Sequence, residues 1–195
     1  ASILILSFFG VDEKYLGMLN IAIGYATSKD GINWHKYGEN PILFEKNSGV
    51  NRPCVVHKDN TYYLYYERDI SGEIALVTAE NPTGPFSESI EVLKADCSWE
   101  EGSLGCMCVL YDEKESIWKM WYSAGRVKIR TWKEPKLIGY ATSKDGIHWE
   151  KYKNNPIVSP SSDIWWLGKA ISSLNVVKRD KLYHGFFHAI SSTDE

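Results

Sequence analysis

The chain has 195 residues, a length that sets one domain as the default and excludes three. Hydrophobic residues make up 44% and charged residues 24%, a composition that excludes disordered, collagen-like and membrane-spanning chains. The 22 Lys and Arg against 25 Asp and Glu give a net charge of −3, which predicts no nucleic-acid or membrane partner and favours a small neutral or polar ligand.

The first apolar run, Ser2 to Phe9, is too short to cross a bilayer and has no basic segment before it, so it predicts a strand rather than a signal or an anchor. No Asn-x-Ser/Thr acceptor remains once Asn81-Pro82-Thr83 is discarded for its proline, which favours a cytoplasmic location; secretion after removal of a signal peptide is the alternative. The cysteines lack metal-binding spacing and are expected to be reduced; they are Cys54, Cys97, Cys106 and Cys108.

An internal repeat organises the chain. The ten residues Ile23 to Ile32 recur unchanged as Ile138 to Ile147, at an offset of 115, and the match runs on to Ile42 and Ile157 with 16 identities over 20 positions. A degenerate copy, Ile74 to Asn81, lies between them, so the 115 residues hold two units that average 57.5 residues. Periods near 50 are typical of propellers and solenoids.

Each unit is predicted to consist of four strands. Runs such as Tyr62 to Tyr66 and Ile117 to Tyr122 are aromatic and β-branched and have no 3.6-residue stripe, while Asp30-Gly31 and Asp145-Gly146 supply the positive φ of tight turns. The predicted strands are 2–9, 21–28 and 33–37 in the first unit, 52–58, 61–67, 73–78 and 86–93 in the second, 104–111, 117–122, 137–142 and 148–152 in the third, and 170–178 and 181–188 in the last.

This pattern predicts a single β-propeller-like domain over residues 1–195, present as about three and a half four-stranded blades. Propellers close with about 4 to 8 blades, so we expect further chain or a partner to complete the ring. The open terminal blades have unpaired edges, which predicts a homo-oligomer formed through them.

The repeated Ile-Gly-Tyr-Ala-Thr-Ser-Lys-Asp-Gly-Ile-x-Trp, with Asn-Pro-Ile after it and Lys119-Met120-Trp121-Tyr122-Ser123-Ala124-Gly125 before its second copy, resembles the blades of five-bladed β-propeller glycosidases. That superfamily includes the arabinanases and xylosidases of glycoside hydrolase family 43, invertase-like enzymes and mannoside phosphorylases. The resemblance spans nearly the whole chain. It implies an all-β five-bladed fold, and an oligosaccharide or polysaccharide bound where the inner strands begin at the channel mouth.

Glycoside hydrolysis requires two carboxyl groups, one protonated and one ionised. The segment from Trp99 to Ser103 looks like the Glu-Gly-Pro segment of arabinanase-like enzymes, which implies that Glu101 is the general acid; a solvated acidic loop is the alternative. The resemblance places the catalytic base on an inner strand that would precede residue 2. Asp69 and Glu67 are therefore the substitute carboxylates, with salt bridging as their alternative role.

Several residues are predicted to contact the substrate at the mouth. Arg52 stands where related enzymes carry a carboxylate, and it can fork onto sugar hydroxyls or form an ion pair with Glu67 or Asp69. Trp165 and Trp166 can stack on a sugar face or fill the core. The full set of predicted substrate contacts is Arg52, Asn51, Trp99, Glu100, Trp165, Trp166, Lys169 and His188.

The remaining motifs favour structural roles. Trp34 and Trp149 belong to the repeat and are assigned to packing between blades, and no histidine has the partners of a metal site, so we predict no catalytic metal and no cofactor. Arg126 to Lys136 is a basic stretch that predicts a solvated hairpin or a clamp for acidic glycans. The sequence thus predicts a glycoside-hydrolase-like protein that cleaves or binds a glycan, with a catalytically inactive carbohydrate-binding or assembly propeller as the alternative.

Overall fold

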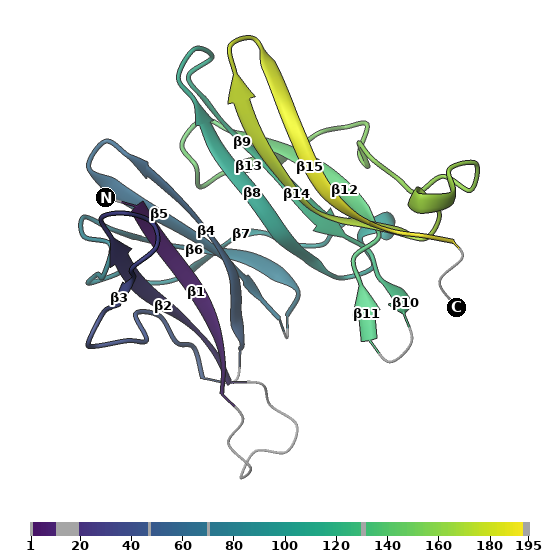
Figure 1. Ribbon diagram of the computed structural model, residues 1–195. Coiled ribbons are helices and arrows are strands. Elements are labelled where there is room, and N and C mark those ends of the chain that lie inside the picture. Colours follow the sequence, from purple (N-terminus) through teal and green to yellow (C-terminus); the bar gives the residue numbers. More distant parts are fainter. Residues whose placement is uncertain (1, 11–19, 47, 70, 130–131, 193–195) are drawn as a thin grey trace.

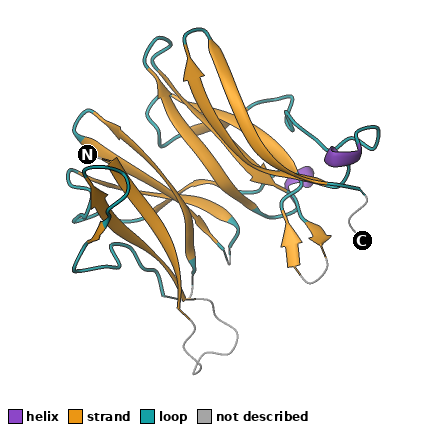
Figure 2. Cartoon of the chain, in the orientation of Figure 1, coloured by secondary structure: helices purple, strands orange, loops and turns teal. Residues whose placement is uncertain are grey.

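The computed structural model describes residues 2–10, 20–46, 48–69, 71–129 and 132–192. Antiparallel sheets dominate these residues, which include no α-helix and only short 3-10 turns (Figures 1 and 2). The predicted all-β class is confirmed. No helix within these ranges is long and apolar enough to span a bilayer.

The sheets follow one another along the chain as blades. Blade one has the order β1 (Ser2–Gly10), β2 (Asn20–Ser28), β3 (His35–Lys36), and blade two the order β4 (Val50–Lys58), β5 (Thr61–Arg68), β6 (Glu73–Ala79), β7 (Ile90–Leu93). Blade three has the order β8 (Leu104–Asp112), β9 (Ile117–Ala124), β12 (Leu137–Ser143), β13 (Trp149–Lys151), with a separate hairpin of β10 (Val127–Ile129) and β11 (Trp132–Glu134). Blade four is the pair β14 (Ala170–Arg179) and β15 (Leu182–Ile190).

Every predicted strand is present. The largest difference between predicted and observed strand bounds is at β7. This strand begins at Ile90 rather than at residue 86. Ser87 takes over the preceding contacts with the neighbouring strand: its backbone N donates to Thr78 O at 2.8 Å and its hydroxyl accepts from Thr78 N at 3.0 Å. A side-chain hydroxyl therefore replaces part of the ladder at that point.

The repeated Asp-Gly turn is held by its aspartate. Asp30 Oδ1 accepts from the backbone N of Ile32 at 2.9 Å and of Asn33 at 2.8 Å. Asp145 Oδ1 makes the same two contacts, each at 2.8 Å, one repeat later. The glycines that follow both aspartates have φ of +76° and +79°, as the sequence predicts.

The repeated asparagine explains the Asn-Pro-Ile motif. Asn40 Oδ1 accepts from Tyr25 N at 2.8 Å, and its Nδ2 donates to Tyr25 O at 2.9 Å. Asn155 makes the same pair of contacts with Tyr140, both at 2.9 Å. Each asparagine thereby fastens the returning segment to the strand that carries the tyrosine, β2 in blade one and β12 in blade three.

Apolar side chains fill the spaces between consecutive blades. One cluster joins blades one and two, a second joins blades two and three, and a third joins blades three and four. The second cluster includes Trp149, whose ring lies 6.0 Å from that of Tyr65 in blade two, so the packing predicted for Trp149 is confirmed. The indole of Trp34 donates to Gly31 O within its own turn.

Two partly buried thiols bridge the inner strands of neighbouring blades. Cys54 Sγ accepts from Val109 N at 3.3 Å, and Cys108 Sγ accepts from Val176 N at 3.4 Å. Burial raises the pKa of Cys54 to about 12, which keeps this sulfur as an unreactive thiol. The four cysteines all lie in the described part of the chain and form no disulfide with one another.

Candidate active site at the start of the inner strands

The inner strands β4, β8 and β14 lie next to one another and share an irregularity near their beginnings. Each breaks register with its partner strand there, between Asn51 and Cys54, Gly105 and Cys108, and Ser172 and Asn175. A non-glycine residue at each break has positive φ: Arg52 (47°), Cys106 (45°) and Ser173 (56°). Such bulges re-aim side chains and are frequent beside active sites.

Four residues predicted from the sequence converge at the bulge of blade two. Arg52 Nη1 lies 2.7 Å from Glu67 Oε2 and 4.0 Å from Asp69 Oδ1. Asn51 Nδ2 donates to Asp69 Oδ2 at 3.4 Å. Asn51 and Glu67 face each other across β4 and β5, and both are buried. The ion pair considered for Arg52 is therefore present, and the guanidinium remains partly exposed.

The inner strand of blade three closes this cluster. Cys106 N donates to Glu67 Oε2 at 3.3 Å. A Cβ atom on Gly105 would stand 2.0 Å from the same carboxylate oxygen, so only glycine leaves room for it. Sequence reasoning missed both residues. Aligning the inner strands on Cys54 and Cys108 would have placed Cys106 at the position of Arg52.

Asp69 has the most informative pKa of the cluster. Partial burial is the largest cause that raises the pKa of Asp69. The negative charge of Glu67 and a hydrogen bond with Glu67 raise this pKa further, while the positive charge of Arg52 lowers it, and the resulting pKa is about 6. A carboxyl group in this range exchanges its proton close to neutral pH.

Glu101 lies on the loop that leads into β8. It follows the 3-10 turn η2 (Ser98–Glu100) in a left-handed conformation, with φ of 51°. Its carboxylate accepts from Arg126 N at 3.0 Å and pairs with the ammonium of Lys136. The segment before β8 is therefore a turn, and neighbouring side chains on it do not alternate as they would in a strand.

Glu100 is fully buried and belongs to a structural network. Its carboxylate accepts from the backbone N of Asp96 at 2.9 Å and of Cys97 at 3.0 Å, and from Tyr122 Oη at 3.0 Å. Lys151 Nζ lies 2.8 Å from it. A sugar would have to displace Lys151 to reach this carboxylate, and the substrate contact expected for Glu100 stays a prediction. Trp99 likewise stacks on Tyr122, with ring centroids 6.1 Å apart, and packs against the core.

The one described group with metal-ligand atoms close together is Asp96, Cys97 and Glu100, whose atoms lie within 4.8 Å of one another. Lys151 Nζ stands 2.6 Å from Asp96 Oδ1 and 2.8 Å from Glu100 Oε2. The ammonium therefore already supplies the positive charge that these carboxylates attract.

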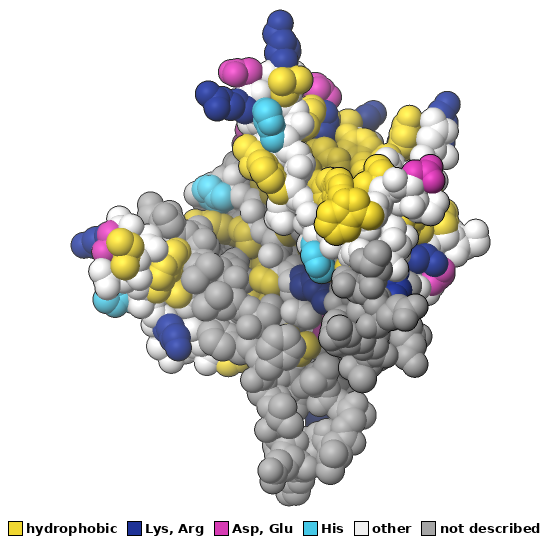
Figure 3. Space-filling view, turned by 45° about the vertical axis from the view of Figure 1, so that its right-hand side comes forward, with side chains coloured by type: hydrophobic (Ala, Val, Ile, Leu, Met, Phe, Trp, Pro, Cys, Tyr) yellow, Lys and Arg dark blue, Asp and Glu magenta, His cyan; other side chains and the backbone are white. Residues whose placement is uncertain are grey.

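The other predicted contacts form a separate group on blade four. Trp165 and Trp166 open the 3-10 turn η3 (Trp165–Leu167) before β14, and Trp165 is 69% exposed. Trp166 stacks on Phe187 with centroids 6.2 Å apart, and hydrophobic side chains are exposed on this side of the molecule (Figure 3). His188 Nδ1 lies 3.5 Å from Ser172 Oγ, and Lys169 N donates to Ile190 O at 3.0 Å.

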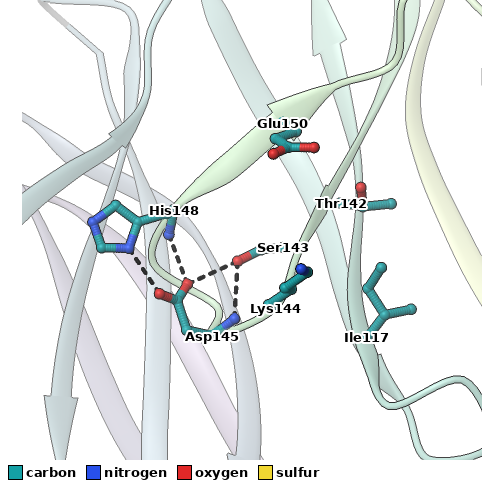
Figure 4. Close-up of a pocket in the computed structure, with 7 residues that line it drawn as sticks. All are labelled: Ile117, Thr142, Ser143, Lys144, Asp145, His148 and Glu150. Carbon is teal, nitrogen blue, oxygen red and sulfur yellow. Dashed lines mark hydrogen bonds and ion pairs between the residues drawn. The ribbon is translucent and has the colours of Figure 1, made fainter.

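A cavity of about 260 Å³ lies in blade three, beside the repeated turn (Figure 4). Asp145 and His148 line it, and His148 Nδ1 stands 2.7 Å from Asp145 Oδ2. The hydrogen bond with His148 and those from the turn backbone lower the pKa of Asp145. Since Asp30 makes the same turn contacts in the first copy, these interactions serve the turn, and we do not place the site here.

The basic stretch forms the predicted hairpin, β10 with β11. The side chains of residues 127–134 lie outside the described part, so the proposed glycan clamp stays a prediction. At its two ends, Arg126 donates to Ser103 Oγ and Lys136 pairs with Glu101. The hairpin is thus fastened to the loop that carries Glu101.

Searches for a matching family model and for a similar curated sequence find none. Solved structures do match. A thermostable family-43 glycoside hydrolase superposes with a TM-score of 0.67 at 18% identity, over 89% of this chain and 57% of its own. An N-acetylgalactosamine deacetylase from F. plautii, in complex with blood group B trisaccharide, gives 0.65 at 14% identity, over 86% and 55%. A family 117 glycoside hydrolase from Zobellia galactanivorans gives 0.57 at 18% identity, over 89% and 54%.

These likenesses concern architecture. The chain spans a little over half the length of each of these structures. At identities below 20% the comparison speaks to the fold and leaves the site to be argued from its own residues. The chain therefore has the fold of the five-bladed β-propeller glycosidases, as its repeat indicates.

Proposed function

We propose that this protein hydrolyses a glycosidic bond where the inner strands of blades two and three begin. The observation that carries the proposal is the Glu67–Asp69 pair, in which Asp69 has a pKa of about 6. A general acid must hold a proton near the working pH and release it during the reaction, and this carboxyl group can do both.

In this proposal Glu67 and Asp69 act as one acid. Both carboxylates approach Arg52, and the negative charge of Glu67 helps to raise the pKa of Asp69, so Asp69 is the member of the pair that holds the proton. Glu67 is held in place by Arg52 and Cys106 N, while Asp69 is the more exposed of the two and delivers the proton. A second, separate carboxylate is still needed.

Glu101 is that second carboxylate. Its loop lies beside the loop that follows Asp69, because Leu104 N donates to Gly72 O at 2.7 Å. The Glu101 carboxylate forms an ion pair with the ammonium of Lys136, and a carboxylate held in this way suits a base or nucleophile. The roles are therefore reversed relative to the family pattern: Asp69 donates the proton and Glu101 remains charged. Asn51 and Arg52 are left to bind sugar hydroxyls, and Trp165 and Trp166 to stack on a sugar face.

The test is a hydrolysis screen with natural oligosaccharides and with nitrophenyl glycosides. Asp69→Asn should slow turnover of natural glycosides by about 10² to 10⁴, the usual share of general acid catalysis. It should lose least on nitrophenyl glycosides, whose leaving group departs without a proton. Glu101→Gln should slow both substrates alike, because it acts on the sugar. Equal loss on both substrates in Asp69→Asn contradicts its role as acid; Glu113→Gln, at an exposed hairpin tip, is the control.

A second candidate function is glycan binding without hydrolysis. It is favoured by the ion pair that already engages Glu101 and by the exposure of Trp165 on blade four. A glycan array decides between the two. If the protein binds glycans without hydrolysing them, Trp165→Ala should abolish binding on the array, whereas Asp69→Asn should leave binding unchanged. No hydrolysis product should then form with any substrate.

A further inference from the structure

The two carboxylates of the proposed active site stand on separate loops, which belong to neighbouring blades. Asp69 lies in the turn between β5 and β6, and this turn is closed by the hydrogen bond that Gly72 N donates to Arg68 O at 2.8 Å. Glu101 follows η2 on the segment that leads into β8. Hydrolysis by a pair of carboxyl groups depends on their separation, so the contact that fixes one loop against the other also sets the geometry of the reaction.

Gly72 is the point where the two loops touch. Leu104 N donates to Gly72 O at 2.7 Å. A Cβ atom on Gly72 would stand 2.7 Å from Gly102 O and 3.0 Å from Ser103 Cα. Both of these atoms belong to the main chain and cannot rotate away, so a side chain at residue 72 must push the loops apart. The φ of Gly72 is +68°, a conformation that also favours glycine.

Ser103 connects this contact to the Glu101 carboxylate. Ser103 is buried, and its hydroxyl accepts a hydrogen bond from the guanidinium of Arg126. The backbone N of Arg126 in turn donates to Glu101 Oε2 at 3.0 Å. A chain of contacts therefore runs from Gly72 through these two residues to the carboxylate of Glu101.

We propose that Gly72 is a positioning residue for the hydrolysis described above, because it lets the loops meet at the distance at which Asp69 and Glu101 act on one glycosidic bond. The role assigned to Gly72 rests on the proposed function. Asn51 and Arg52, which are left to bind the sugar, belong to the same blade as Asp69. A wider contact at Gly72 would therefore move Glu101 away from the bound sugar and leave Asp69 in place.

The test compares Gly72→Ala with Gly31→Ala. Gly31 has φ of +76° and nothing lies within 4 Å of the Cβ atom it would gain, so this control has the same backbone penalty without a contact between loops. We expect kcat of Gly72→Ala to fall by about 10²-fold with KM unchanged, the cost of misplacing a catalytic group by about 1 Å. The loss should be equal on natural and nitrophenyl glycosides, as in Glu101→Gln. Gly31→Ala should keep the wild-type kcat.

Ser103→Ala tests the same chain of contacts without adding an atom to the loops. It removes the hydroxyl that accepts from Arg126 and leaves the backbone contact with Gly72 in place. We expect kcat to fall on the order of tenfold, with KM unchanged, on both classes of substrate. This variant also decides the matter if Gly72→Ala does not fold, since an unchanged kcat in Ser103→Ala then overturns the proposal.

A merely structural role for Gly72 gives a different result. The free energy of unfolding of Gly72→Ala then falls, while the folded variant retains the wild-type kcat. That outcome, or a loss confined to natural glycosides, overturns the role of Gly72 and leaves the proposed function standing. Absence of hydrolysis by the wild-type protein on every substrate overturns the proposed function and the role of Gly72 together.

Discussion

Two pairs of acidic residues, one in blade two and one just before blade three, differ in how the fold orients their side chains. Glu67 and Asp69 are two residues apart at the end of β5, so their side chains leave the chain on the same side and both approach Arg52. Glu100 and Glu101 are adjacent at a left-handed turn, so one is buried beside Lys151 and the other reaches Lys136 at the surface.

The comparison shows what turns a carboxylate into a structural or a reactive group. Glu100 is buried, and its carboxylate accepts from two backbone N–H groups and from Tyr122 Oη, so all of its contacts hold the fold together. Asp69 is partly desolvated beside a second carboxylate, and both effects raise its pKa to about 6. Burial alone does not distinguish the two cases; the balance of donors and like charges does.

The largest expected effect is the loss of stability when the buried Glu100 is replaced. Glu100→Ala should lower the free energy of unfolding by about 3–5 kcal/mol, because two backbone N–H groups and Tyr122 Oη lose their buried acceptor and Lys151 loses one of its two carboxylate partners. Urea unfolding measures the change, with Glu101→Ala as the matched neighbour. Similar losses in both variants would remove the distinction drawn between these glutamates.

The next effect is a pH dependence from Asp69. Its folded-state pKa of about 6 lies above the ordinary value, so its contribution to stability is fully present below about pH 4 and is lost as the pH rises through 6. The contribution is on the order of 2–3 kcal/mol. Asp69→Asn should remove it. The quantity to measure is the difference in free energy of unfolding between wild type and variant across this range, and a difference that does not change with pH argues against the raised pKa.

Gly105→Ala tests the contact between blades that holds Glu67. The new methyl group must displace the carboxylate or the strand, which should lower the free energy of unfolding by about 1–3 kcal/mol. Gly38→Ala is the control, because nothing lies within 4 Å of the Cβ it would add. The variant should also move the pH at which Asp69 titrates, followed by carboxyl NMR shifts. An unmoved titration would mean that Gly105 does not position the pair.

The smallest expected effect on stability is that of Glu101→Gln. An exposed ion pair contributes about 0–1 kcal/mol, so loss of the contact with Lys136 should shift the urea midpoint little. The same variant should abolish hydrolysis if Glu101 is the charged catalytic partner. A large loss of stability with intact activity would reverse both assignments.

The repeat and its turn residues were enough to predict the strands, because alternating aromatic runs and Asp-Gly turns are local signals. Asn51, Arg52, Glu67 and Asp69 could be grouped because one hairpin brings them together. Gly105 and Cys106 were missed because they belong to blade three and contact Glu67 of the neighbouring blade two. The orientation of Glu100 and Glu101 depends on a 3-10 turn that ends in a left-handed residue. The local sequence contains no signal that predicts this turn.

The shared bulge of the inner strands has a consequence for how such a protein can change. Arg52, Cys106 and Ser173 have the same left-handed backbone although they are a cation, a thiol and a hydroxyl. The main chain at these positions is therefore inherited with the blade, whereas the functional group can be exchanged by a single codon change. Duplication of a blade supplies a ready-made position at the site, and point mutation alone can then give it a new chemistry without rebuilding the sheet.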